Sequence, residues 1–290
     1  MPHLEPYKGD YYLWKYLPNL PVCIVFGVLF LFITTAHIWR MIKARLWFCS
    51  PFIFGGIIMI LGFLMRGIAY YNTSNLIFYI LQSTFLVLPP AFFAASMYMV
   101  YTRIVRALGR EDCSIIPPRW STRLFLAADI LCINIQGNGA GLTANQTPAV
   151  ATAGRWILIS GLILHVVVFT GFIYICAIFH RRFRHYLANT GETTLVPWRQ
   201  SLTMLYGTSV TIMARNIFRT IEYVMGEDAY LLSNEWPLYV FDFGPMAVVM
   251  LAFLIWYPGN LHGSGRECME LHSRDSAGEP FARGKTSERT

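Results

Sequence analysis

Charged residues are scarce in this chain: Asp, Glu, Lys and Arg make up 13% of its 290 residues, against about 25% in soluble domains. Hydrophobic residues reach 55%, and the mean hydropathy is +0.46. This composition excludes an ordinary soluble domain. The apolar residues fall into blocks, most of them close to the roughly 20 residues that a membrane-crossing helix needs. The seven blocks are 20–39, 48–70, 76–101, 124–142, 156–179, 201–225 and 236–257. The sequence therefore predicts an all-α integral membrane protein with seven transmembrane helices.

Nucleotide-binding and hydrolase motifs are also absent. The sequence holds no Walker A motif, no GxGxxG after a strand, no HExxH and no GxSxG. All lysines lie outside the seven blocks, which excludes a retinal Schiff base despite the seven helices. They are Lys8, Lys15, Lys43 and Lys285. We therefore expect no enzymatic activity, cofactor, metal site or nucleic-acid partner, and we expect the partners to be membrane lipids.

Basic residues are missing from every second loop. The loops around 40–47, 102–123 and 180–200 are rich in Arg and Lys, whereas 71–75, 137–154 and 226–235 contain neither. Short cytoplasmic loops concentrate Lys and Arg, so the pattern predicts an external N-terminus and a cytoplasmic C-terminus. The domain division is then an external segment over 1–19, a seven-helix domain over 20–257 and a disordered cytoplasmic tail over 258–290.

Two N-x-S/T sequons, at Asn72 and Asn145, fall in loops that are predicted to be external. Asn72 lies close to the membrane, which makes Asn145 the better candidate for glycosylation. None of the six cysteines falls in an external loop, and thiols on the cytoplasmic side stay reduced. We therefore expect free cysteines.

Charged residues inside a membrane helix are costly, yet the block 201–225 contains several. At about 100° per residue, they share one helix face with two threonines. This polar face comprises Thr208, Thr211, Arg215, Arg219 and Glu222. The opposite face is assigned to Val210, Ile212, Ile217 and Ile221. The polar stripe must face protein or water rather than lipid.

Helix depth pairs this stripe with the last block. Arg219 and Asp242 each lie six residues from the outer end of their helix, which is about 9 Å deep. The loop between these helices is short, so the two residues are natural ion-pair partners. Arg66 lies in the same leaflet, and Glu235 lies at its rim. The candidate substrate-binding or ion-pair cluster comprises Arg66, Arg215, Arg219, Glu222, Glu235 and Asp242.

The sequence leaves two interpretations of this cluster open. It can be a buried ion-pair network that fixes helix packing, or a headgroup or proton site that opens to the outer leaflet.

Three more polar residues inside the blocks, Asp129, Gln136 and His165, are candidates to line a cavity. Close helix packing explains the nearby glycines as well, and a lone histidine is more often a hydrogen-bonded packing residue. The run GNGAGL predicts an unwound outer end for the block 124–142. Prolines at 89, 90 and 245 predict kinks.

The most specific pattern in the chain is R-x-x-x-R-x-x-E-x-x-x-G followed by E-x-x-x-Y-x-x-D. It is formed by Arg215, Arg219, Glu222, Gly226, Glu235, Tyr239 and Asp242. Further matches are Gln82, Pro90, Tyr98, Arg103, Asp129, Gln136, Gly62 and Arg66. On these residues the chain resembles the fungal RTA-like lipid-translocating exporter family, over about 16–258. It departs at Met59, where the family usually has Glu, and at His165, where the family usually has Gln.

The resemblance implies a role linked to aminosterol resistance and sphingoid-base release. We expect an exporter, in the plasma membrane or an endomembrane, that translocates amphipathic lipids such as sphingoid long-chain bases, phospholipids or aminosterol-like compounds. One alternative is a seven-helix lipid sensor or receptor without transport activity. Another is an intramembrane enzyme in which His165 with Asp129 or Glu222 does acid–base chemistry, although no metal-ligand spacing supports it.

Overall fold

The computed structural model describes residues 14, 17–143, 147–190, 198–226, 230 and 234–256. In these ranges the chain is helical and has no strand. The helices are α1 (Leu20–Ala44), α2 (Ser50–Ala69), α3 (Leu76–Val87), α4 (Pro89–Ala107), α5 (Pro118–Thr143), α6 (Pro148–Thr190), α7 (Trp198–Met225), α9 (Trp236–Leu238) and α10 (Gly244–Ile255). Asn145, the tail 258–290 and most of the segment 1–19 lie outside the described residues.

Within the described ranges the helices form seven stretches long enough to cross a membrane, because α3 continues into α4 and α9 into α10. Five of them are also apolar enough: Leu20–Ala44, Trp47–Ala69, Leu76–Ala107, Pro148–Thr190 and Trp236–Ile255. The other two, α5 and α7, carry charged residues such as Asp129 and Arg215, which lower their hydropathy. The prediction of an all-α membrane protein with seven helices is confirmed.

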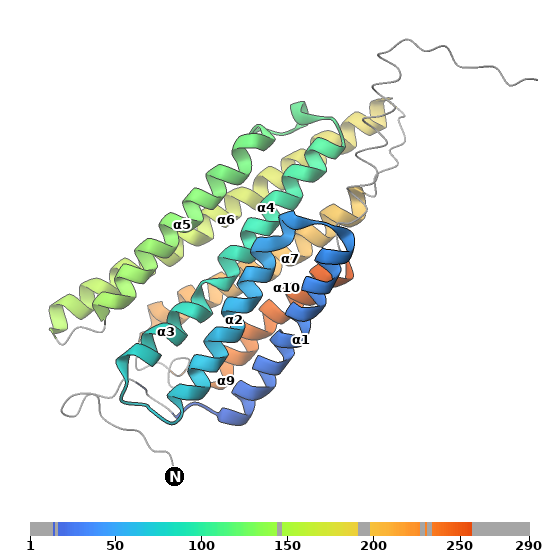
Figure 1. The fold of residues 1–290 in the computed structure, drawn as a ribbon. Helices are drawn as coiled ribbons and strands as arrows, with labels where there is room; N and C mark the ends of the chain where they lie inside the picture. Colours follow the sequence, from blue (N-terminus) through green and yellow to red (C-terminus); the bar gives the residue numbers. More distant parts are fainter. Residues whose placement is uncertain are drawn as a thin grey trace, which may run out of the picture.

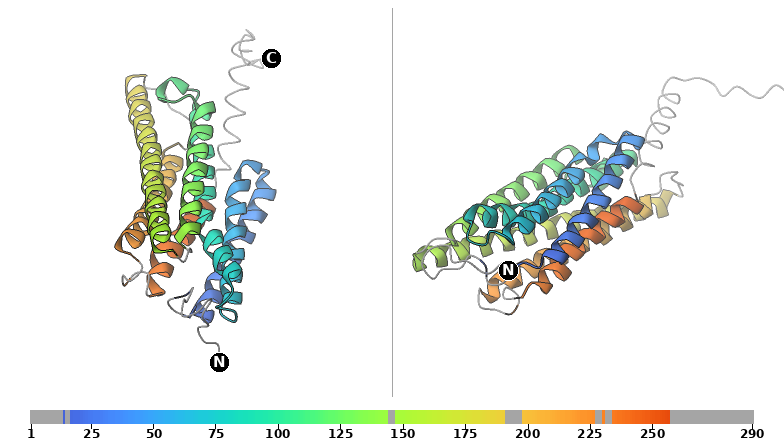
Figure 2. Two further views of the ribbon diagram at one scale, coloured as in Figure 1. Left: turned by 90° about the vertical axis from the view of Figure 1, so that its left-hand side faces the viewer. Right: turned by 60° about the horizontal axis from the view of Figure 1, so that its bottom comes forward.

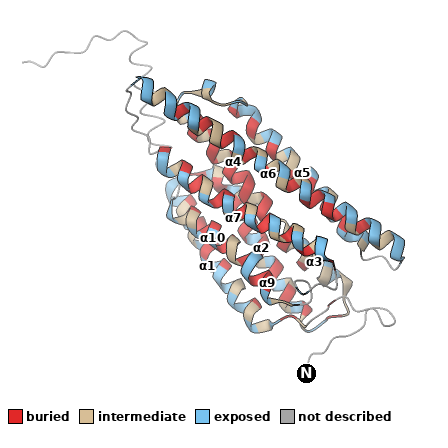
Figure 3. Ribbon diagram, turned by 180° about the vertical axis from the view of Figure 1, so that it is seen from behind, coloured by how far each residue is buried: buried red, intermediate tan, exposed pale blue. Residues whose placement is uncertain are grey.

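The helices run along one common direction and form a bundle (Figure 1, Figure 2). On one side of the bundle α5 and α6 pack along each other, and α4 and α7 lie between this pair and α1, α2 and α10. Buried residues line the facing sides of the helices, while exposed residues point outward (Figure 3). Many outward side chains are large and apolar; Phe32 is 71% exposed and Val167 is 60% exposed. An apolar surface of this extent suits contact with lipid.

Proline bends two of these stretches, as the sequence predicts. Because proline lacks a backbone N–H, the helix breaks at Leu88, and α4 starts at Pro89. Near Pro245 the distortion is a π-helical turn, Tyr239–Phe243, in which the N–H of Gly244 donates to the carbonyl of Tyr239. Such turns are uncommon and occur frequently at functional sites.

The ends of several helices extend past the apolar blocks. α1 continues to Ala44, so Lys43 lies in its last turn and not outside the helix as the sequence analysis had it. A cation there is favourable because a helix C-terminus carries partial negative charge. The described cysteines, Cys23, Cys49, Cys113, Cys132 and Cys176, are free thiols.

The prediction of an unwound outer end before Thr143 is wrong, because α5 stays helical through its glycines. Close packing against α6 is the physical reason. A Cβ atom added at Gly139 would lie 2.5 Å from the backbone nitrogen of Leu158, and one at Gly154 would lie 2.6 Å from Cβ of Leu142. Only residues without a side chain let the two backbones approach this closely.

This packing predicts a position-specific effect of alanine. Gly139→Ala is expected to lower the free energy of unfolding by about 1–3 kcal/mol, the usual cost of overpacking. The matched control is Gly137→Ala, because a Cβ atom at Gly137 meets nothing within 4 Å and alanine favours the helix by about 1 kcal/mol. Thermal unfolding in detergent measures both variants. Equal melting temperatures for the two would contradict the close approach at Gly139.

Candidate functional site

One face of α7 is polar and buried inside the bundle. Its buried members are Thr208, Arg215, Arg219 and Glu222, and Thr211 is partly exposed. The outward face comprises Val210, Ile217 and Ile221, all more than 40% exposed. The assignment of Ile212 to this outward face is wrong, since Ile212 is 0% exposed. At about 100° per residue it lies only about 60° from Arg215 and belongs to the inner side.

Asp242, on the π-helical turn before α10, binds two arginines of α7, Arg215 and Arg219. Its Oδ2 accepts a hydrogen bond from Arg219 Nη2 at 2.5 Å, and its Oδ1 accepts one from Arg215 Nε. Asp242 itself is 1% exposed. The pair that depth predicts, Arg219 with Asp242, is therefore present, and the carboxylate also reaches the arginine one turn deeper.

Glu222 completes this inner group by accepting a hydrogen bond from Arg219 Nη1 at 2.9 Å. Two arginines thus face two carboxylates, and their formal charges cancel. In and beside this inner group, three buried donor nitrogens have no hydrogen-bond partner among the described residues: Arg215 Nη2, Arg219 Nε and Asn216 Nδ2. Since buried donors are normally satisfied, the inner group is short of acceptor oxygens.

A second group, nearer the end of the bundle where α2 ends and α9 begins, is built around Glu235. Its Oε1 accepts hydrogen bonds from Arg66 Nη2 at 2.6 Å and from the Tyr239 hydroxyl at 2.8 Å. Arg66 also donates from Nη1 to Gln82 Oε1 at 3.1 Å. The guanidinium of Arg66 lies 5.7 Å from the ring of Trp14, which is 5% exposed. The predicted cluster therefore consists of an inner group on α7 and the π-helical turn, and a rim group that ties α2 to the start of the last span.

The three cavity candidates are spread along α5 and α6. Asp129 is 1% exposed and accepts a hydrogen bond from the Tyr98 hydroxyl at 2.8 Å, and His165 Nε2 lies 3.6 Å from its Oδ1. Gln136 instead donates to the carbonyl of Gly161 at 3.1 Å and so joins the two helices. In the described part of the chain no group of three or more His, Cys, Asp or Glu residues is placed to hold a metal ion.

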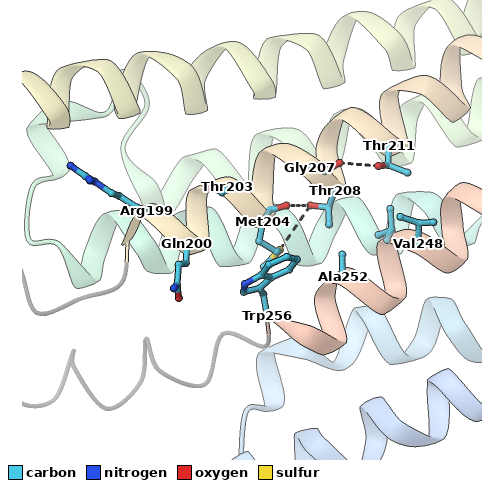
Figure 4. Close-up of a pocket in the computed structure, with 11 residues that line it drawn as sticks. Arg199, Gln200, Thr203, Met204, Gly207, Thr208, Thr211, Val248, Ala252 and Trp256 are labelled. Atoms are coloured by element: carbon cyan, nitrogen blue, oxygen red, sulfur yellow. Dashed lines mark hydrogen bonds between the residues drawn. The ribbon is translucent and has the colours of Figure 1, made fainter.

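A cleft of about 460 Å³ opens elsewhere, between the first half of α7 and the end of α10 (Figure 4). The residues that line it are Arg199, Gln200, Thr203, Met204, Gly207, Thr208, Thr211, Val248, Val249, Ala252 and Trp256. This volume falls within the roughly 300–1,000 Å³ of small-molecule sites. Its last α7 residue, Thr211, lies four positions before Arg215, so the cleft ends about one helical turn from the inner group.

The walls of this cleft are more apolar than its residue types suggest. The hydroxyls of Thr208 and Thr211 donate to the carbonyls of Met204 and Gly207 at 2.8 and 2.9 Å (Figure 4). Such bonds within one helix satisfy the hydroxyl locally. The long polar side chains of Arg199 and Gln200 lie at the end of the cleft where α7 starts (Figure 4), while the remainder of the lining suits a hydrocarbon chain.

Sequence reasoning missed Asn216, the Tyr98 contact to Asp129 and the cleft. Asn216 directly follows Arg215 in the sequence, and this position beside an arginine inside a membrane helix could have identified it as a site residue. The cleft left no such signal, because Gly207 and Val248 are ordinary membrane-helix residues that meet only when α7 packs on α10.

Comparison with known proteins places these residues in a family. The family described as RTA1 like protein matches residues 52–264, which contain both groups of the cluster. Protein RTM1 of Saccharomyces cerevisiae is 31% identical over 226 residues, which cover 76% of this chain and 71% of that protein. Protoporphyrin uptake protein 1 of the same yeast is 30% identical over 227 residues, covering 76% and 72%. The yeast sphingoid long-chain base transporter RSB1 is 25% identical over 295 residues, covering 89% and 77%.

No solved structure matches this chain. The family match spans well over half of the 290 residues, and it contains the buried arginines and carboxylates described above. The chain belongs to the RTA1-like family.

Proposed function

We propose that this protein is a membrane transporter that moves amphipathic lipids between the two leaflets or out of the cell. Relatives named as a sphingoid long-chain base transporter and a protoporphyrin uptake protein support transport in general. Among amphipathic substrates, sphingoid long-chain bases, phospholipids and aminosterol-like compounds combine a polar head with a bulky apolar part.

The inner group on α7 is the observation that carries this proposal. Buried ion pairs that serve packing alone tend to have their hydrogen bonds satisfied, whereas Arg215, Arg219 and Asn216 keep spare buried donors. A headgroup oxygen would supply the missing acceptors, because arginine binds phosphate and similar oxygens strongly. The apolar cleft that ends one turn from Arg215 would hold the hydrocarbon chain of the same molecule.

The experiment is lipid translocation in proteoliposomes with headgroup-labelled lipids, one carrying an amine and one a phosphate. Glu222→Gln is the informative variant, because glutamine still accepts the bond from Arg219 while the inner group gains one positive charge. We expect translocation of the amine lipid to fall about tenfold or more, equivalent to about 1.4 kcal/mol. Translocation of the phosphate lipid is expected to change by less than about threefold.

Glu111→Gln is the matched control, because Glu111 is exposed in the turn between α4 and α5. Both variants must remain folded at the assay temperature, as checked by their melting curves. If the wild type moves none of several lipids, the transporter proposal fails and a lipid sensor without transport replaces it. If the wild type moves lipid and Glu222→Gln moves both lipids normally, the inner group is structural and the substrate binds elsewhere.

We also propose an external N-terminus, a cytoplasmic C-terminus and residence in the plasma membrane. The supporting observation is that arginines gather at the bundle end where α4 and α6 extend beyond their apolar blocks. There Arg103 packs over the ring of Phe48 at 3.8 Å and Arg110 over that of Tyr186 at 4.1 Å. A C-terminal tag that is cleaved by protease added to intact cells would contradict this orientation.

A further inference from the structure

Asp129 of α5 and His165 of α6 face each other in a part of the bundle that neither the charge cluster nor the cleft includes. Asp129 is 1% exposed and His165 is 5% exposed. Their nearest polar atoms, Asp129 Oδ1 and His165 Nε2, lie 3.6 Å apart. The other carboxylate oxygen, Oδ2, accepts a hydrogen bond from the Tyr98 hydroxyl at 2.8 Å.

The pair lies within the membrane-spanning part of the bundle, because Asp129 stands in the apolar block 124–142, five residues from its start and thirteen from its end. Asp129 is eleven residues from the start of α5 at Pro118 and fourteen from its end at Thr143. At 1.5 Å per residue these separations are about 16 Å and about 21 Å. A carboxylate at this depth is costly unless it is neutralised.

No arginine or lysine neutralises Asp129 within the part of the chain that the structure describes, where its ion-pair contact is His165. The carboxylates of the charge cluster differ in this respect, because Asp242 accepts from two arginines and Glu222 from one. Asp129 Oδ1 and His165 Nε2 are both buried without a hydrogen-bond partner. Unmet buried polar atoms are unfavourable, because they lose their hydrogen bonds to water without replacing them.

An added proton would cancel the charge of the pair. If it resides on Oδ1, the carboxyl group can donate to the bare Nε2 of a neutral imidazole; if it resides on the ring, the imidazolium can donate from Nε2 to Oδ1. Either bond requires the two atoms to come closer than their present separation of 3.6 Å. In either form the pair has no net charge. Without the proton, the carboxylate keeps a negative charge that only hydrogen bonds stabilise.

The other ionisable groups that face this pair come from four helices. Tyr98 on α4 and Cys132 on α5 are neutral neighbours of Asp129, Cys176 on α6 is a neutral neighbour of Tyr98, and Arg215 on α7 is close enough for its charge to act on His165. Arg215 also binds Asp242 in the inner group. A change of charge at Asp129 and His165 therefore acts on the electrostatics of the charge cluster through Arg215.

We propose that Asp129 and His165 form an intramembrane proton-binding site, at which one proton taken from water is shared between Asp129 Oδ1 and His165 Nε2. The Tyr98 hydroxyl keeps its own proton and holds the carboxylate in position. Proton binding here needs no substrate, so its test is independent of the transporter proposal.

Infrared difference spectroscopy on the full chain in lipid nanodiscs tests the site directly. Acidification from about pH 9 to about pH 5 is expected to produce a carboxylic-acid C=O band. Exposed aspartates titrate near pH 3.9 and stay ionised in this range. In wild-type protein labelled with ¹³C at the aspartate carboxyl carbons, the band is expected to move; a band that does not move, or no band at all, overturns the proposal.

Variants identify the residues. Asp129→Asn keeps the shape of the side chain and is expected to lose the band, whereas Asp112→Asn, at an exposed loop acid, is expected to keep it. A band that persists in folded Asp129→Asn overturns the assignment. His165→Gln is expected to shift the midpoint of the band by about one pH unit or more; an unchanged midpoint overturns the shared proton. If Asp129→Asn does not fold, the band of the labelled wild type and its midpoint in His165→Gln still test the proposal.

Discussion

Asp242→Asn is expected to lower the free energy of unfolding by about 3–5 kcal/mol, the cost of removing one partner from a buried ion pair. The wild-type carboxylate accepts from Arg215 and Arg219 at once. Asparagine has no charge, and its amide would present N–H donors to one of two guanidinium groups. Two positive charges would then share the bundle interior with Glu222 alone. Thermal unfolding of the purified protein in detergent measures the loss, together with the yield of monodisperse protein.

A compensating variant separates this charge effect from general damage to the fold. Arg219→Gln combined with Asp242→Asn leaves one arginine, Arg215, and one carboxylate, Glu222, so the formal charges cancel again. The double variant is expected to be more stable than Asp242→Asn alone, because residues in one ion-pair network do not contribute additively. Asp112→Asn, at an exposed acid, should melt like the wild type. If Asp242→Asn alone were as stable as the wild type, the charge cluster would add nothing to stability.

The arrangement of spans was predictable, because apolar blocks of about 20 residues specify membrane helices with little ambiguity. The ion pair of Arg219 and Asp242 was predictable for a related reason. A helix rises by a fixed 1.5 Å per residue, and a short loop forces the two helices together, so equal residue counts from the loop give equal depth. That argument needs no knowledge of side-chain conformation.

The contacts that failed prediction depend on helix rotation and on distortions of the backbone. Asp242 reaches Arg215 as well because it stands on the π-helical turn Tyr239–Phe243, and nothing in the sequence near Pro245 distinguishes such a turn from a simple kink. The meeting of Asp129 and His165 depends on which faces of α5 and α6 touch. Depth alone allows several such pairings.

The glycine-rich end of α5 shows a different limit. The run GNGAGL suits an unwound segment and a closely packed helix equally well, since glycine permits both. The partner helix decides between them, because α5 stays helical where Leu158 of α6 approaches Gly139 so closely that no side chain fits there. Local sequence could not supply that partner.

Filling the cleft is expected to slow lipid translocation about tenfold or more, a difference of about 1.4 kcal/mol, without unfolding the protein. Gly207→Leu is the variant, because Gly207 lines the cleft and a Cβ atom there meets nothing within 4 Å. The leucine would occupy the space proposed for the hydrocarbon chain, between Met204 and Val248.

Gly171→Leu is the matched control, since Gly171 in α6 has the same free space around its Cβ position but lies outside the cleft. Melting temperatures in detergent should be at least as high as that of the wild type for both variants, because leucine favours a helix over glycine. A translocation rate that falls equally in both variants would point to a general effect on the bundle, and an undiminished rate in Gly207→Leu would remove the cleft from the transport path while leaving the inner group as the headgroup site.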